Sequence, residues 1–303
     1  MIVAHLSDLH LRTADDAAGF GARLDRVVTR GADHLVITGD LLDRWNPPLL
    51  NAALDVLQAR GLLHAERLTI IHGNHDLASS GGHPRERSDL RRLVARFWDP
   101  PPTLAARKRA FYRTISERAA GVVAAAPPFV KSTAGGLRMA ALDTVPAPWR
   151  PFTVQWRRLT LRHGQGAIDP AHCSWLAALR GSPPLLVLLH HYPLPVAPFE
   201  FDVGRRLDLH TASGWLAPLA RWHVVVPMEI DAADRQRFWE AARAADVSLV
   251  LCGHVHRARL EHQERIAVGL NGQSGAAWAG RTIAYYRIEG PRVTVEYDSA
   301  RAA

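Results

Sequence analysis

Thr69-Ile70-Ile71-His72-Gly73-Asn74-His75-Asp76 is the stretch of sequence that most strongly indicates how this chain folds. Its short apolar, β-branched run predicts a buried strand, and a glycine ends that strand. Three side chains that can bind a metal ion or exchange a proton follow the glycine. Because many strands end in a polar turn, the stretch indicates a functional site only if other strands end in the same way.

Two strands predicted before this stretch also end in reactive side chains. Residues 2–6 and 34–38 form apolar runs, and each is followed by polar residues: Ser7-Asp8-Leu9-His10 after the first, and Gly39-Asp40-Leu41-Leu42-Asp43-Arg44 after the second. Amphipathic spacing predicts helices at about 15–30 and 47–57. The alternation of strand and helix favours parallel neighbouring strands whose carboxyl ends lie at one edge of a sheet.

Two further apolar strands are predicted in the second half of the chain, at 185–189 and 247–252. They end in His190-His191-Tyr192-Pro193 and Gly253-His254-Val255-His256. Ligand sites of open α/β sheets gather beyond the carboxyl ends of strands, so all five strand ends can converge. Carboxylates, imidazoles and a carboxamide, without thiolates, suit divalent ions such as Mn, Fe, Zn or Ni. Two such ions roughly 3.5–4 Å apart can share a hydroxide and clamp phosphoryl oxygens, which predicts a hydrolytic centre.

The composition indicates a globular protein. The chain has 303 residues, of which 48% are hydrophobic and 22% charged, which argues against disorder. Its net charge of +8 suggests an anionic partner such as nucleic acid, although a genomic bias toward arginine explains it equally well. Cys173 and Cys252 are expected to be free thiols, so a cytoplasmic location is predicted. Neither a membrane span nor a signal peptide is expected.

Two segments depart from the alternating pattern. Residues 79–120 combine arginines with aromatic side chains and predict two basic helical pieces, at 85–98 and 104–118. This insertion is expected to form either a lid over the site or a helical pair packed by its own aromatic residues. A proline-rich excursion at about 195–227 has weak periodicity, and a loop rich in Pro and Trp is expected near 149–156. Since no linker or repeat is evident, a single domain over 1–303 is predicted.

The five strand-end motifs, in this order, resemble those of the calcineurin-like metallophosphoesterase superfamily, and they extend from residue 8 to residue 256. The resemblance implies an α/β fold (α+β in some schemes), a four-layer α/β/β/α sandwich of two mixed sheets flanked by helices. The opening Ser7-Asp8-Leu9-His10-Leu11, the block Asp40-Leu41-Leu42-Asp43 and Trp175-Leu176 resemble the bacterial cyclic-nucleotide phosphodiesterase-like branch.

The resemblance also implies which residues hold two divalent metal ions. One ion would be held by Asp8, His10, Asp40 and His256, and the other by Asp40, Asn74, His190 and His254. His190 is preferred to His191 as the ligand because it is the first polar residue after the buried strand. His191 is then expected behind the ligands or facing the substrate.

Catalytic roles are implied in the same way. The resemblance implies that His75 stabilises the transition state or protonates the leaving oxygen, and Asp43 is expected to orient its ring. Arg44 is a candidate contact for the substrate phosphate. Asp76 is expected to cap a helix, and Asp143 to be structural.

Three functions follow as hypotheses. The first is hydrolysis of a phosphodiester, such as a cyclic nucleotide or another small diester, or of both diesters and monoesters, by attack of a hydroxide that bridges the two ions. The alternative is a metal-dependent DNA or RNA nuclease, suggested by the +8 charge and the arginines at 85–118. The third is a non-catalytic interaction module. Such modules usually lose metal ligands, whereas every ligand position is filled in this sequence. No feature of the sequence specifies an oligomeric state.

Overall fold

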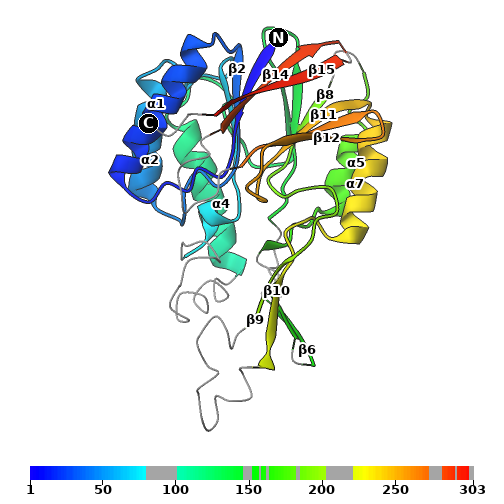
Figure 1. The fold of residues 1–303 in the computed structure, drawn as a ribbon. Helices are drawn as coiled ribbons and strands as arrows, with labels where there is room; N and C mark the ends of the chain where they lie inside the picture. The colour runs from blue at the N-terminus through cyan, green and yellow to red at the C-terminus, as the bar shows by residue number, and fades with distance from the viewer. Residues whose placement is uncertain are drawn as a thin grey trace.

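A five-stranded mixed sheet forms one half of the protein (Figure 1). The computed structural model describes residues 1–79, 101–145, 152–156, 158–161, 164–181, 185–202, 221–272, 282–290 and 292–299. The sheet has the order β15-β14-β1-β2-β3, built from β1 (Ile2–Leu6), β2 (His34–Thr38), β3 (Leu68–Ile71), β14 (Thr282–Glu289) and β15 (Arg292–Ser299). Strands β1, β2 and β3 are parallel, with Leu6 opposite Ile37 and Thr38 opposite Ile71. Their polar carboxyl ends therefore lie together.

A six-stranded mixed sheet forms the other half, in the order β12-β13-β11-β8-β5-β4. It consists of β4 (Phe129–Ser132), β5 (Arg138–Ala141), β8 (Leu185–Leu188), β11 (Val247–Cys252), β12 (Arg259–Gln263) and β13 (Ile266–Leu270). The central strands β13, β11, β8 and β5 are parallel, and the two edge strands are antiparallel to their neighbours. Because Leu251 lies opposite Leu188, the strand ends that carry His190 and His254 are also adjacent.

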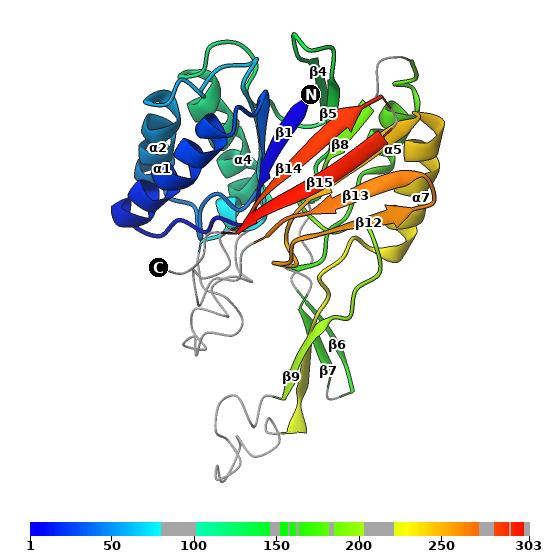
Figure 2. The same cartoon turned by 45° about the horizontal axis from the view of Figure 1, so that its top comes forward.

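The two sheets pack face to face between two layers of helices (Figure 2). Apolar side chains from both sheets fill the space between them, among them Val36, Ile71, Met139 and Leu188. Helices α1 (Ala14–Thr29), α2 (Pro47–Gln58) and α4 (Pro101–Ser116) cover the five-stranded sheet, and α5 (Pro170–Ala177) and α7 (Ala232–Ala244) cover the six-stranded sheet. The four-layer α/β/β/α sandwich implied by the sequence motifs is confirmed.

Local sequence signals set where several helices begin. The Thr13 side chain accepts a hydrogen bond from the Asp16 backbone N–H, and the Asp16 side chain accepts from the Thr13 N–H, so α1 begins with a capping box. Asn46 caps α2 ahead of two prolines. Asp169 and Asp231 cap α5 and α7. Each such cap contributes about 1 kcal/mol to helix stability.

A third, small sheet extends from the sandwich on the side where the strand carboxyl ends lie (Figure 1). Its order is β6-β7-β10-β9, from β6 (Phe152–Gln155), β7 (Arg158–Leu161), β9 (Phe199–Asp202) and β10 (His223–Val226). Strand β6 lies where a loop was predicted near 149–156, and β9 and β10 lie within the proline-rich excursion at about 195–227, whose weak periodicity did not indicate these strands. Each is only four residues long, too short for a clear alternation. Residues 203–220 lie outside the described residues.

Helix α4 belongs to the core. Phe111, Tyr112 and Ile115 are buried with the side chains that cover the five-stranded sheet. The second basic piece of the predicted insertion is therefore a packed helix held by its own aromatic residues, whereas the first piece, at 85–98, lies outside the described residues. No helix in the described part of the chain is long and apolar enough to cross a membrane.

Candidate metal centre

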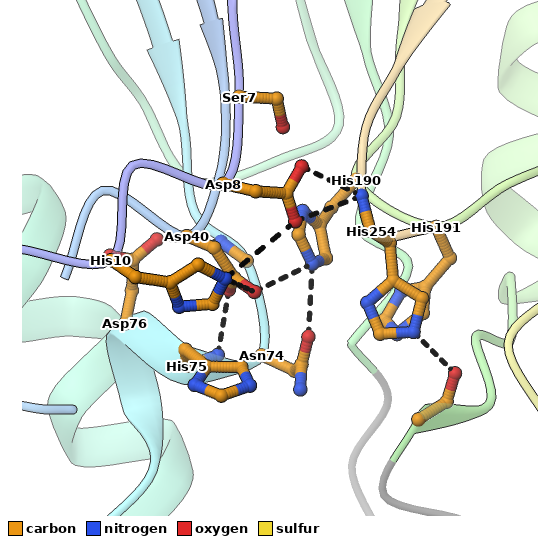
Figure 3. A network of polar contacts seen from close by, with 12 residues as sticks. Ser7, Asp8, His10, Asp40, Asn74, His75, Asp76, His190, His191 and His254 are labelled. Atoms are coloured by element: carbon orange, nitrogen blue, oxygen red, sulfur yellow. Dashed lines mark hydrogen bonds and ion pairs between the residues drawn. The ribbon is translucent and has the colours of Figure 1, made fainter. Parts of the chain in front are cut away.

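Seven side chains from both sheets meet at the shared edge of the sandwich, and Figure 3 labels six of them, all except His256. From the five-stranded sheet, the loops after β1, β2 and β3 bring in Asp8, His10, Asp40 and Asn74. From the six-stranded sheet, the loops after β8 and β11 bring in His190, His254 and His256. All seven residues that the family resemblance implied as metal ligands are thus brought together.

Most of these residues have a backbone conformation that side chains rarely adopt. Positive φ angles occur at Asp8 (54°), His10 (46°), Asp40 (51°), His254 (73°) and His256 (52°). Asp and His tolerate this left-handed region better than most residues, but each instance still costs free energy. Such strain gathers at functional sites, where the surrounding structure holds it in place.

The first group of donor atoms consists of Asp8, His10, Asp40 and His256. The Nε2 atoms of His10 and His256 lie 3.2 Å apart. Asp8 Oδ1 lies 3.3 Å from His256 Nε2, and Asp40 Oδ2 lies 3.8 Å from His10 Nε2. Two imidazole nitrogens and two carboxylate oxygens thus face one small space, a donor set that suits a divalent ion.

The second group consists of Asp40, Asn74, His190 and His254. His190 Nε2 lies 2.9 Å from Asn74 Oδ1 and 3.4 Å from Asp40 Oδ2. Its Nδ1 lies 2.9 Å from the Thr38 carbonyl oxygen, which can only accept, so Nδ1 carries the proton and Nε2 is free to bind a cation. In His254 the roles are reversed, because Nε2 lies 2.7 Å from the Gly164 carbonyl oxygen. Asp40 belongs to both groups.

His191 lies behind this second group. Its backbone N–H and Nδ1 both contact Thr144 Oγ1, at 3.2 and 2.9 Å, and its ring centroid lies 4.4 Å from that of His254. The side chain is fully buried. His191 also offers a nitrogen within 4.8 Å of donor atoms of His190 and His254. The contacts with Asn74 and Asp40, however, are made by His190, which favours His190 as the ligand.

The electrostatics of the site fit a bound cation. Asp8 and Asp40 are buried, and Asp40 Oδ2 accepts no hydrogen bond among the described residues. Burial lowers the pKa of His190, but the carboxylate of Asp40 outweighs this effect and raises it to about 9. Two buried carboxylates therefore attract positive charge, which divalent ions supply more fully than protonated imidazoles.

Two glycines allow the loops to approach this closely. A β-carbon on Gly73 would lie 2.2 Å from Asp40 Oδ1, and one on Gly253 would lie 1.9 Å from Ser7 Oγ and 2.4 Å from Asp8 Oδ2. Any larger residue at either position would displace a carboxylate of the site.

His75 borders the first group, with its ring edge-on to His10 at a centroid distance of 4.5 Å. Its backbone N–H donates to Asp40 Oδ1, at 2.8 Å. The ring Nδ1 lies 3.0 Å from the backbone carbonyl oxygen of Asp43 and 3.8 Å from its carboxylate. Of these two contacts from Asp43 to the His75 ring, the shorter one is therefore made by the backbone carbonyl oxygen.

The Asp43 carboxylate instead lies between two other side chains, 3.6 Å from His10 Nδ1 and 3.4 Å from Arg12 Nε. Arg44 is exposed and, among the described residues, shows no contact with the donor groups. Sequence reasoning overlooked Arg12, whose only signal was a basic residue directly after Asp8-Leu9-His10-Leu11.

The predicted capping role of Asp76 was wrong. Its buried carboxylate accepts hydrogen bonds from the backbone N–H groups of Leu42 and Gly73, both at 2.8 Å. It thus ties the loop after β2 to the loop after β3. Asp143 is paired with His72 and Lys108, as expected for a structural role.

A family model described as calcineurin-like phosphoesterase matches residues 1–258 of the chain. Among solved structures, a dimetal phosphatase from Danio rerio is similar with a TM-score of 0.60 and 10% sequence identity, covering 99% of this chain and 96% of that chain. The phosphopantetheinyl hydrolase PptH from Mycobacterium tuberculosis gives a TM-score of 0.46 at 14% identity, covering 89% of each chain. A comparison with curated proteins gave no match. At 10% identity, the first similarity shows a shared fold.

Proposed function

Because this chain belongs to the calcineurin-like phosphoesterase family, we propose that it is a phosphodiesterase that hydrolyses a cyclic nucleotide or another small diester with two divalent metal ions. Family membership makes it a metal-dependent phosphoesterase. The observation that carries the two-ion assignment is the pair of donor groups that share Asp40. The choice of a small diester is supported by the likeness of Ser7-Asp8-Leu9-His10-Leu11 to the cyclic-nucleotide branch.

The proposed roles of the ligands follow from the geometry. Asp8, His10 and His256 hold one ion, Asn74, His190 and His254 hold the other, and Asp40 contacts both. Two bound ions supply positive charge to the phosphoryl oxygens and lower the pKa of water. The carbonyl oxygens of Thr38 and Gly164 select which nitrogen of His190 and His254 faces an ion, a function typical of groups just outside the ligand shell.

His75 is the proposed proton donor to the leaving oxygen. The Asp43 carbonyl oxygen accepts from Nδ1, so Nε2 is the ring nitrogen from which a protonated His75 would donate to the leaving oxygen. The hydrogen bond from the His75 backbone to Asp40 fixes the ring beside the shared ligand. Arg12 Nε lies 3.4 Å from the Asp43 carboxylate, which makes Arg12 a candidate contact for a phosphate oxygen of the substrate. The exposed Arg44 is the other candidate for this contact.

The nuclease alternative has less support from the described residues. The basic side chains on and just after α4 are largely engaged within the protein. Arg107 donates to the Leu77 carbonyl oxygen, Lys108 pairs with Asp143, and Arg118 pairs with Asp55. These three basic side chains are therefore less available to nucleic-acid phosphates. The complete donor set also opposes a purely non-catalytic module, and a cytoplasmic location remains a prediction.

The test is hydrolysis by the purified protein after metal removal and addition of Mn²⁺, Fe²⁺, Zn²⁺ or Ni²⁺. We expect cleavage of bis(p-nitrophenyl) phosphate and of at least one cyclic nucleotide, with slower cleavage of p-nitrophenyl phosphate and of single-stranded DNA. Asn74→Ala should lower kcat at least about 100-fold, because it removes a ligand. Asn51→Ala, on the exposed face of α2, is the matched control. Faster cleavage of the monoester or of DNA would contradict the proposed substrate class.

A further inference from the structure

A buried polar cluster lies beside the candidate metal centre and is not part of it. Tyr112 Oη lies 2.6 Å from His72 Nδ1, and His72 Nε2 lies 3.2 Å from Asp143 Oδ1. Lys108 Nζ pairs with Asp143 Oδ2 and donates to the Val145 carbonyl oxygen at 2.9 Å. A consistent set of protons places the Tyr112 hydroxyl as donor to His72 Nδ1, with the His72 Nε2–H on the side that faces the Asp143 carboxylate.

This cluster joins the two sheets. His72 follows β3 of the five-stranded sheet, Asp143 follows β5 of the six-stranded sheet, and Lys108 and Tyr112 both come from α4. The second donor group also spans the sheets, because Asp40 and Asn74 come from one and His190 and His254 from the other. The distance between the ligands from one sheet and those from the other therefore depends on the contacts that hold the two sheet edges together.

Asn271 Nδ2 also links the sheets by donating to the His5 carbonyl oxygen at 2.6 Å, whereas two other polar links at this edge involve proposed ligands. The Asp8 carboxylate accepts from the His254 backbone N–H at 2.9 and 3.0 Å, and His190 Nδ1 contacts the Thr38 carbonyl oxygen. These contacts must coexist with metal binding. The pair of His72 and Asp143, in contrast, uses no proposed ligand and can hold its geometry whether or not an ion is bound.

The neighbours of this pair carry its position into the site. Gly73 and Asn74 directly follow His72, and Gly73 lies against Asp40. Thr144 directly follows Asp143, and its hydroxyl contacts both the backbone N–H and the ring of His191, next to His190. A shift of Asp143 would therefore move both sides of the second donor group.

We propose that Asp143, held by Lys108 and His72, is a positioning residue that sets the affinity of the second metal position, formed by Asp40, Asn74, His190 and His254. The inference rests on the proposed two-metal function. Outer groups that orient ligands typically change metal affinity by about 10- to 100-fold. The first position, which draws only His256 from the other sheet and lies on the far side of Asp40, should change much less.

The experiment is a titration of the full-length, metal-depleted protein with Mn²⁺. Binding is measured by isothermal titration calorimetry, and formation of the coupled ion pair is measured by electron paramagnetic resonance. For Asp143→Asn we expect one Mn²⁺ to bind about 10- to 100-fold more weakly and the coupled signal to need correspondingly more Mn²⁺, while the other ion stays within about threefold of wild type. Lys108→Arg, which keeps a positive charge opposite Asp143, should bind both Mn²⁺ ions with near wild-type affinity. Asp55→Asn is the matched control, because it removes a 2.5 Å ion pair between α2 and Arg118.

Two results would overturn the inference: unchanged affinities for both ions in Asp143→Asn, or equal weakening of both, as expected for general loosening of the fold. Should Asp143→Asn fail to fold, Tyr112→Phe removes only the hydroxyl that contacts His72 and should weaken the same ion about three- to tenfold; no change in this variant would refute the inference. The proposed function fails separately, if the wild-type protein binds fewer than two ions.

Discussion

Replacing Gly253 by alanine tests whether the close approach of the two sheets is what creates the metal centre. Gly253 lies between β11 and His254, and its backbone needs no left-handed φ angle. The effect of the substitution is therefore one of space. The added β-carbon would lie 1.9 Å from Ser7 Oγ and 2.4 Å from Asp8 Oδ2.

The magnitude follows from these distances. Ordinary contact begins at 3.4 Å, so the Asp8 oxygen must move by about 1 Å from its position at 2.4 Å. Metal–ligand distances tolerate deviations of only about 0.2 Å. We therefore expect the first ion to lose Asp8 as a ligand and to bind at least about 100-fold more weakly. Overpacking should also lower the free energy of unfolding of the metal-free protein by about 1–3 kcal/mol.

The assay is calorimetric titration of metal-depleted protein with Mn²⁺, combined with urea unfolding. Gly19→Ala is the matched control, because a β-carbon there meets nothing within 4 Å and the position is inside α1. It should leave metal affinity unchanged and raise the free energy of unfolding by about 0.5–1 kcal/mol. Wild-type Mn²⁺ affinity in Gly253→Ala would refute the reasoning, since the carboxylate would then not need its observed position.

Three further predictions concern stability. Chelation of divalent ions should lower the Tm seen in scanning calorimetry, because the ions bind only the native state, and an unchanged Tm would argue against a formed site. Burial lowers the pKa of His34 from 6.5 to about 4; the neutral ring stabilises the fold above pH 6.5, and roughly 3 kcal/mol is lost as the pH falls to 4. Urea unfolding at pH 7 and pH 4.5 should show this loss in wild type and less of it in His34→Gln. Lys131 Nζ donates to the carbonyl oxygens of Ala65, Leu68 and Val122, so Lys131→Met should cost about 2–4 kcal/mol in urea unfolding without changing Mn²⁺ affinity.

The sheet core and the gathering of the seven donor residues could be predicted from sequence because their signals are local. Runs such as Thr69-Ile70-Ile71 specify buried strands, and the polar residues that follow them must lie at the strand ends. Parallel pairing then brings those ends to one edge. No long-range information is needed for this step, whereas the four-layer architecture was predicted from the resemblance of the motifs to the family.

Features that depend on contacts between distant segments could not be predicted. The small sheet pairs residues near 152–161 with residues near 199–226, and its four-residue strands carry too short a pattern. Residues 121–126 form no strand, although the Val123 carbonyl oxygen accepts a hydrogen bond from the Ile70 backbone N–H. Likewise, whether Asp43 orients His75 through its carboxylate or its carbonyl oxygen depends on backbone angles that residue identity does not specify.

The left-handed backbone of the site residues affects how substitutions there must be interpreted. Replacing Asp8 or Asp40 with alanine removes a donor atom and also puts a residue that disfavours positive φ at that position, at a further cost of about 1–2 kcal/mol. Asparagine tolerates the same angles, so Asp→Asn and His→Asn variants separate ligand chemistry from backbone strain. An alanine scan across Asp8, His10, Asp40, His254 and His256 would attribute to metal binding a loss of stability that comes partly from the main chain.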